Sequence, residues 1–122
     1  MIEIGIDSQV LEKIRDGRKT VEGRLARGKF LAIKAGDVIS VREDFYVDGV
    51  ITGVKEDSLR MRVVAVKKFD NFRLMLGDVG FKKAIPDAIT LDDACIEYLR
   101  FYSEASQEEY GVLAISFQLI RP

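Results

Sequence analysis

The segment from residue 111 to 120 is almost entirely apolar, and it constrains the fold more than any other part of the chain. Its sequence, GVLAISFQLI, is far too short for a membrane-spanning helix, and it does not alternate between apolar and polar side chains. A short continuous apolar run that follows a glycine is typical of a strand buried on both faces. The rest of the chain must therefore cover this strand on two sides.

Alternating patterns and capping residues predict the other elements. Strands are predicted at residues 1–6, 20–25, 38–42, 45–54 and 59–69. Helices are predicted from Asp7 or Ser8 to a stop at Gly17, from a cap at Asp70 to Gly77, and from Thr90 to about Tyr102. Ile96, Leu99 and Phe101 are expected to supply the buried side of the last helix. Asp48-Gly49 marks either a tight hairpin or a bulge, whereas residues 55–58, KEDS, are the stronger turn signal.

Several strands with two or three inserted helices indicate an α+β domain built around a small, partly closed β-barrel. The chain has 122 residues, of which 48% are hydrophobic and 32% charged, and it contains no repeat or linker. Residues 1–122 are therefore expected to form a single domain.

The residues that are missing exclude several kinds of chemistry. The chain has no histidine, so a Ser-His-Asp triad, a Cys-His pair and a His-ligated metal are excluded. Its one cysteine, Cys95, is expected to be a buried structural thiol. The N-terminus lacks a secretory leader pattern, so we expect a cytoplasmic protein without a membrane segment, metal or cofactor. Its oligomeric state is not predictable from the sequence.

Charge is distributed unevenly although the net charge is only −1. Residues 13–34 carry eight cations and two anions, whereas residues 85–110 carry seven anions and one cation. The basic segment could be exposed to phosphate, or it could pair with the acidic segment inside the fold or across a dimer. The acidic face formed by residues 92–109 could alternatively bind a protein partner.

The most informative chemistry lies in residues 17–24, GRKTVEGR, which place three cations, a hydroxyl and a carboxylate between and beside two glycines. These residues are typical of an anion or nucleotide site, although exposed charges on an amphipathic strand are the simpler alternative. Strand alternation puts Thr20, Glu22 and Arg24 on one face. Lys19 can converge with Glu22 only if it lies in the turn after Gly17, and this is what we expect.

The order of motifs resembles the activating signal cointegrator homology (ASCH) domain, a family of the PUA-like superfamily of small mixed β-barrels. The resemblance covers approximately residues 11–120. It rests on the spacing of Gly17, Lys19, Glu22 and Arg24, the pair Gly36-Asp37, and residues 69–76, 101–103 and 110–115.

This resemblance implies a cleft lined by the G-x-K-x-x-E-x-R residues and a role in binding RNA or a nucleotide-like ligand. Lys19 and Arg24 would contact phosphate or carbonyl groups, and Glu22 would accept hydrogen bonds from an exocyclic amine or hold Arg24 in place. Single-stranded RNA is read by such charges together with aromatic stacking. The candidate ligand-binding residues are Arg18, Lys19, Thr20, Glu22, Arg24, Tyr102 and Tyr110.

Enzymatic activity is the alternative that the resemblance leaves open. Some small bacterial ASCH proteins are amidohydrolases that deacetylate acetylcytidine with a lysine matched by Lys19, a threonine three residues later and a glutamate on a downstream helix. Here Glu22 occupies the threonine position, and residues 70–76 contain no glutamate. Other members are ribonucleases, for which no complete catalytic set can be mapped here. If the chain is an enzyme, Lys19 and Glu22 are its candidate catalytic residues.

Overall fold

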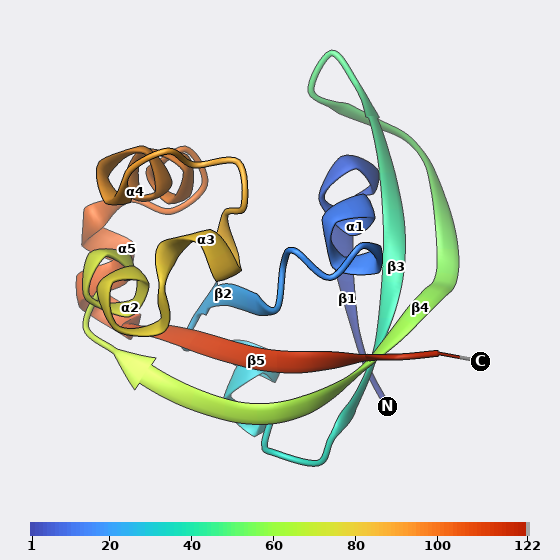
Figure 1. The fold of residues 1–122 in the computed structure, drawn as a ribbon, viewed down its shortest axis with the longest axis horizontal. Helices are drawn as coiled ribbons and strands as arrows, with labels where there is room; N and C mark the ends of the chain where they lie inside the picture. The colour runs from blue at the N-terminus through green and yellow to red at the C-terminus, as the bar shows by residue number, and fades with distance from the viewer. Residues whose placement is uncertain (122) are drawn as a thin grey trace.

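The computed structural model describes residues 1–121 of the chain. A five-stranded mixed sheet curls into a half-barrel, and four of the helices gather beside one end of it (Figure 1). The elements in chain order are β1 (Ile2–Asp7), α1 (Ser8–Arg15), β2 (Val21–Leu25), the 3₁₀ helix η1 (Gly28–Ala32), β3 (Val38–Val47), β4 (Val50–Phe69), α2 (Phe72–Val79), α3 (Phe81–Ala84), α4 (Leu91–Leu99), α5 (Glu104–Tyr110) and β5 (Val112–Ile120).

The strands follow the order β1-β3-β4-β5-β2, so β1 and β2 are the two edges of the sheet. β1 runs parallel to β3, and the other neighbouring pairs are antiparallel. This arrangement confirms the predicted α+β fold with a PUA-like mixed sheet. The helices are more numerous than the two or three expected, because α3 and α5 are short elements without a strong helical pattern in the sequence.

The strand β5 separates two hydrophobic cores. Leu113, Ile115 and Phe117 pack into the first core, which lies inside the curve of the sheet with Leu11 of α1. Val112 and Ala114 face the second core, which α2 and α4 cover. The prediction that this strand is buried on both faces is therefore confirmed, and its uniform apolarity follows from having a core on each side.

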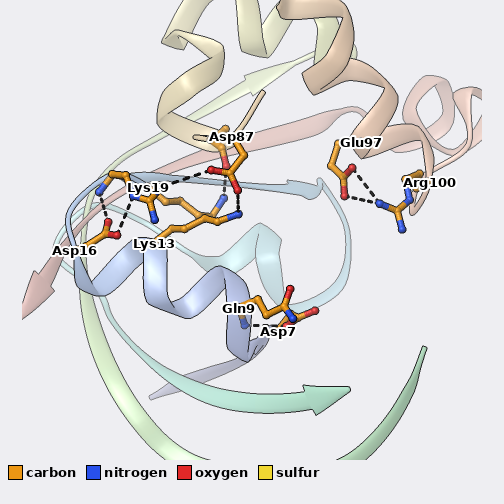
Figure 2. Close-up of polar contacts among 10 residues, drawn as sticks. Asp7, Gln9, Lys13, Asp16, Lys19, Asp87, Glu97 and Arg100 are labelled. Atoms are coloured by element: carbon orange, nitrogen blue, oxygen red, sulfur yellow. Dashed lines mark hydrogen bonds and ion pairs between the residues drawn. The ribbon is translucent and has the colours of Figure 1, made fainter. Parts of the chain in front are cut away.

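Helix α1 ends where the sequence predicts. The carboxylate of Asp7 accepts a hydrogen bond from the Gln9 N–H at the start of the helix (Figure 2). Gly17 follows the last turn with φ of 85°, a conformation that glycine adopts without a steric penalty. The chain leaves α1 at this glycine and turns toward β2.

The hairpin turn of the sheet is Asp48-Gly49, with φ of 52° and 77°, and not residues 55–58. The prediction of a turn at 55–58 is wrong, because these residues continue β4 and the irregularity there is a local one at Asp57, with φ of 48°. Successive residues with positive φ suit the tight turn of a β-hairpin. The four polar residues 55–58 resemble a turn in the sequence, although they lie inside the long strand β4.

In the second half of the chain, both ends of α2 and the end of α4 differ from the prediction, whereas the predicted start of α4 is confirmed. Asn71, and not Asp70, caps α2 by accepting a hydrogen bond from the Leu74 N–H, and α2 continues through Gly77 to Val79. Thr90 and Asp93 form the predicted capping box of α4, which ends at Leu99.

The predicted apolar side of α4 is wrong. Ile96, Leu99 and the following Phe101 are exposed, whereas Ala94, Cys95 and Tyr98 are buried. Cys95 is the buried thiol expected from the sequence, and burial raises its pKa. Within residues 1–121, no helix has the length and apolar character that crossing a bilayer requires.

Candidate ligand-binding site

The segment between α1 and β2 is held by backbone hydrogen bonds from three directions. The Lys19 N–H donates to the Lys13 carbonyl oxygen over 3.0 Å, and the Thr20 N–H donates to the Lys83 carbonyl oxygen over 2.9 Å. The Thr20 carbonyl oxygen accepts from the Phe117 N–H over 3.1 Å. Because Lys19 lies before β2, its side chain is free of the strand alternation that would direct it away from Glu22.

Lys19 is almost completely buried, with 3% of its surface exposed. Its Nζ donates to the carbonyl oxygens of Val21 over 2.9 Å and Ala84 over 2.6 Å, and it lies 3.5 Å from Oε1 of Glu22. Three oxygen acceptors surround one ammonium group, which matches its three N–H donors. Lys19 thereby links β2 to α3.

Glu22 is buried between two cations. Its Oε1 also accepts from the Gly23 N–H over 3.1 Å, and its Oε2 lies 3.4 Å from Nη2 of Arg24. The same Nη2 donates to the Gly5 carbonyl oxygen over 3.0 Å. Lys19, Glu22 and Arg24 therefore form one continuous polar chain, whose Arg24 side chain keeps 20% of its surface exposed.

Burial and neighbouring charges shift the pKa values of Glu22 and Lys19 in opposite directions. Burial on its own raises the pKa of the Glu22 carboxyl, but Lys19 and Arg24 outweigh it and hold that pKa below its usual value. Burial lowers the pKa of the Lys19 ammonium, and the Glu22 carboxylate opposes this shift. Glu22 is therefore ionised, and it is fixed by the residues on both sides of it.

Tyr98 completes the cluster, and sequence reasoning missed it. A side chain on Gly23 would place a Cβ 2.6 Å from the Tyr98 hydroxyl oxygen, so the ring lies directly against the strand. The hydroxyl is buried without a hydrogen-bond partner among residues 1–121, and burial raises its pKa well above the usual value. Gly23 was the available signal, because a glycine inside a strand often marks a close approach. We refer to Lys19, Glu22, Arg24 and Tyr98 as the Glu22 cluster.

Two more aromatic side chains extend from the cluster. The ring of Tyr98 stacks on Phe72 at 4.1 Å between centroids, and Tyr102 lies 5.3 Å from the same Phe72 ring. Tyr102 is half-buried, and burial raises its pKa although Arg24 opposes this shift. The guanidinium carbon of Arg27 lies 5.2 Å from the ring centroid of Tyr110. Arg24 and Arg27 thus each lie near a tyrosine ring, that of Tyr102 and that of Tyr110.

The basic and acidic segments do meet, at Asp87. Its carboxylate lies 2.5 Å from Lys13 Nζ and 3.5 Å from Nη1 of Arg18 (Figure 2). Arg18 also pairs with Asp16. Elsewhere the acidic segment pairs with cations outside the basic segment, as Glu97 does with Arg100 at the end of α4 (Figure 2) and Asp92 with Arg73 of α2. Asp87 is therefore the one residue of the acidic segment that forms an ion pair with the basic segment among the described residues. Most cations of the basic segment are not paired with the acidic segment.

Two hollows lie beside the cluster. One of about 700 Å³ is lined by residues of α2, α4 and α5, including Tyr110, and another of about 420 Å³ is lined by Thr20, Lys83 and Phe117. Neither lining includes Lys19, Glu22 or Arg24. The structure thus brings these three together, with Tyr102 near Arg24, and places Thr20 and Tyr110 at the neighbouring hollows. Arg18 lies apart, at the surface.

Contacts on three sides leave Lys19 little freedom to act as a nucleophile. Burial keeps its pKa below the usual value, but the hydrogen bonds to Val21 and Ala84 and the nearby Glu22 carboxylate hold its ammonium group in place. A fixed carboxylate, a guanidinium and a hydroxyl instead offer an acceptor, a donor and a group that can do both.

Comparison with known proteins supports the family resemblance. The ASCH domain family model matches residues 4–121. The structure is similar to the hypothetical protein PH0355, with 29% identity, a TM-score of 0.82 and 97% of each chain covered. It is also similar to PF0455 from Pyrococcus furiosus, with 32% identity, a TM-score of 0.75 and coverage of 99% of this chain and 98% of that one.

A more distant structure, EF3133 from Enterococcus faecalis, shares the fold with 18% identity and a TM-score of 0.61, over 93% of this chain and 71% of that one. No curated protein sequence matches the chain significantly. The family match extends over almost the whole chain and includes every residue of the Glu22 cluster. The chain belongs to the ASCH domain family.

Proposed function

We propose that the chain binds single-stranded RNA or a nucleotide-like ligand at the Glu22 cluster. The observation that carries this proposal is the Tyr98 hydroxyl, which is buried without a partner beside an ionised carboxylate held between two cations. A buried hydroxyl without a partner costs stability, and a ligand that hydrogen-bonds to it would offset this cost.

The accessible groups around the cluster suit the rest of a nucleotide. Arg24 is the cluster member that solvent reaches, and Arg27 lies at the surface against the Tyr110 ring. Guanidinium groups bind phosphate oxygens, and tyrosine rings stack on unpaired bases. Arg18 and Lys13 would add phosphate contacts in competition with Asp87.

Hydrolysis of a modified nucleoside is our second candidate. Lys19 occupies the position of the family's catalytic lysine, but its ammonium is directed to two carbonyl oxygens and Glu22. Among residues 72–79, which form α2, there is no glutamate to complete the set. A third possibility, a protein partner on the acidic face, is weaker because Asp92 and Glu97 already pair with Arg73 and Arg100.

Fluorescence anisotropy with short labelled single-stranded RNAs tests the proposal. Affinity should fall with salt by roughly 0.7 log units per log unit of salt for each phosphate contact. Arg24→Gln should weaken binding about tenfold or more, because it removes a charge-assisted contact. Arg60→Ala is the matched control, since Arg60 is an exposed arginine on β4 that pairs with Asp57. Absence of binding at low salt, or equal loss in both variants, would contradict an RNA role for the cluster.

A further inference from the structure

The β3–β4 hairpin continues well beyond the rest of the sheet. β1 pairs with β3 only as far as Asp44, and β5 pairs with β4 only from Arg60 onward. Residues 45–58 therefore form a two-stranded arm whose outer backbone edges have no strand partner among the described residues. Its turn stands out past α1 at the top of Figure 1.

The arm is apolar on both of its faces. Tyr46 pairs with Ile51, and Val47 pairs with Val50, and successive pairs point to opposite faces. Six large apolar side chains on the arm are 41–64% exposed, namely Phe45, Tyr46, Val47, Val50, Ile51 and Val54. The outer part of the arm, residues 45–54, has Asp48 as its only charged side chain, and the base of the arm adds Lys55, Glu56 and Asp57.

Exposure of such an arm to water is energetically unfavourable. An isolated two-stranded hairpin is at best marginally stable, and an unprotected apolar edge strand is a template for pairing with another strand. The six residues together leave roughly 500–600 Å² of surface exposed, divided between the two faces of the arm. A second strand along the edge of β4 would satisfy the free backbone groups and cover part of the apolar side chains on each face.

We propose that this arm is a homodimerisation element, in which the arms of two copies pair through the outer edge of β4 around a two-fold axis. An antiparallel strand pair is self-complementary, so the same edge serves on both copies. In a pairing centred on Val54, the charged residues 55–57 of one copy lie opposite the uncharged residues 51–53 of the other, so like charges do not meet. RNA does not fit this arm, because residues 45–58 hold one cation, Lys55, and three acids. A lipid surface would leave the free N–H and C=O groups of the edge unsatisfied, whereas a second strand pairs them.

Sedimentation equilibrium over a wide concentration range tests the proposal on the intact chain. We expect reversible dimers of twice the 13.7 kDa chain mass. Val54→Glu should weaken dimerisation about tenfold or more, because Val54 is the middle residue of the free edge 50–58 and pairs with itself across the two-fold axis, so that two carboxylates meet there. Ile96→Glu is the control, since Ile96 is also an exposed apolar residue but lies on α4, and it should leave the dimer unchanged. Far-UV circular dichroism verifies that each variant is folded.

A charge-swap experiment identifies the arm-to-arm contact. Val54→Lys should also weaken the homodimer, whereas an equal mixture of Val54→Glu and Val54→Lys should restore dimers, because opposite charges then meet at the axis. Backbone amides of residues 50–58 should exchange more slowly as the concentration rises. A wild-type chain that stays monomeric throughout would overturn the proposal, as would dimers that persist in both charge variants. Monomers that bind neutral phosphatidylcholine vesicles, and lose this binding in Val54→Glu, would also overturn it and would assign the arm to a membrane.

Discussion

The guanidinium group of Arg24 on β2 donates a hydrogen bond to the carbonyl oxygen of Gly5 on β1, with 3.0 Å between Nη2 and the oxygen. β1 and β2 are the opposite edges of the sheet, so this bond joins the two ends of the half-barrel. The same nitrogen lies 3.4 Å from Glu22. Arg24 therefore connects the architecture of the sheet to the proposed binding site.

Arg24→Ala should destabilise the fold as well as weaken RNA binding. It removes a charge-assisted hydrogen bond and one of the two cations beside Glu22, which should lower the free energy of unfolding by about 1–3 kcal/mol. Urea unfolding measures this value. Arg60→Ala, which removes an exposed pair, should change stability by less than about 1 kcal/mol. Equal stability of Arg24→Ala and the wild type would contradict the bridging role.

Gly23→Ala should be destabilising by about 1–3 kcal/mol through overpacking. The new Cβ would lie 2.6 Å from the Tyr98 hydroxyl oxygen, 2.9 Å from Tyr98 Cζ and 3.0 Å from Phe72 Cε1. Gly53→Ala is a control, because a Cβ at Gly53 meets nothing within 4 Å. Thermal unfolding of both variants provides the comparison. If both lose the same stability, strand propensity and not the contact with Tyr98 is responsible.

Tyr98→Phe should separate stability from binding. Deleting a buried hydroxyl without a partner should leave the free energy of unfolding unchanged or raise it by up to about 1 kcal/mol. The same change should weaken RNA binding, since the ligand loses its partner for a hydrogen bond. Chemical denaturation and anisotropy measure the two effects, with Tyr46→Phe on the exposed arm as control. Unchanged affinity in Tyr98→Phe would remove the main support for the cluster as a binding site.

Acid should destabilise the fold partly through Glu43. Its carboxylate accepts hydrogen bonds from Ser8 over 2.6 Å and Ser58 over 2.7 Å. These bonds hold its pKa below the usual value of 4.5. A carboxyl whose pKa is lower in the folded state stabilises the fold above its unfolded pKa, and this contribution disappears as the pH falls through the folded value.

The free energy of unfolding should therefore decrease between about pH 5 and pH 3, and less steeply in Glu43→Gln than in the wild type. Denaturant titrations at several pH values measure both slopes. Glu12→Gln, an exposed position on α1, should keep the wild-type slope. Parallel curves for wild type and Glu43→Gln would assign the acid sensitivity to other carboxyl groups.

Deacetylation of acetylcytidine should be weak or absent. Glu22 stands where the deacetylating members of the family carry a threonine, and its carboxylate opposes the lowering of the Lys19 pKa by burial. The assay is release of acetate from acetylated cytidines by the purified protein. Robust turnover that is lost in both Lys19→Ala and Glu22→Gln would make the hydrolase function correct. In that case Glu22 would act as the base and Lys19 would stabilise a developing oxyanion.

Local patterns determined the first half of the site. Helix α1, its stop at Gly17, and the glycine, lysine, glutamate and arginine spacing of residues 17–24 were readable because caps and strand alternation depend on neighbouring residues. The double burial of β5 was readable for the same reason, since an unbroken apolar strand requires cover on both faces. The order of these motifs was sufficient to indicate the ASCH family.

Tertiary packing decided what local patterns could not. Residues 55–58 continue a strand because β3 lies beside them, although their composition suggests a turn. Tyr98 joins the site from 75 residues beyond Gly23, and α4 buries the side that faces Phe72 and not its most apolar side. Contacts between residues distant in sequence leave no periodic trace in either segment, so only the folded chain brings Tyr98 to Glu22.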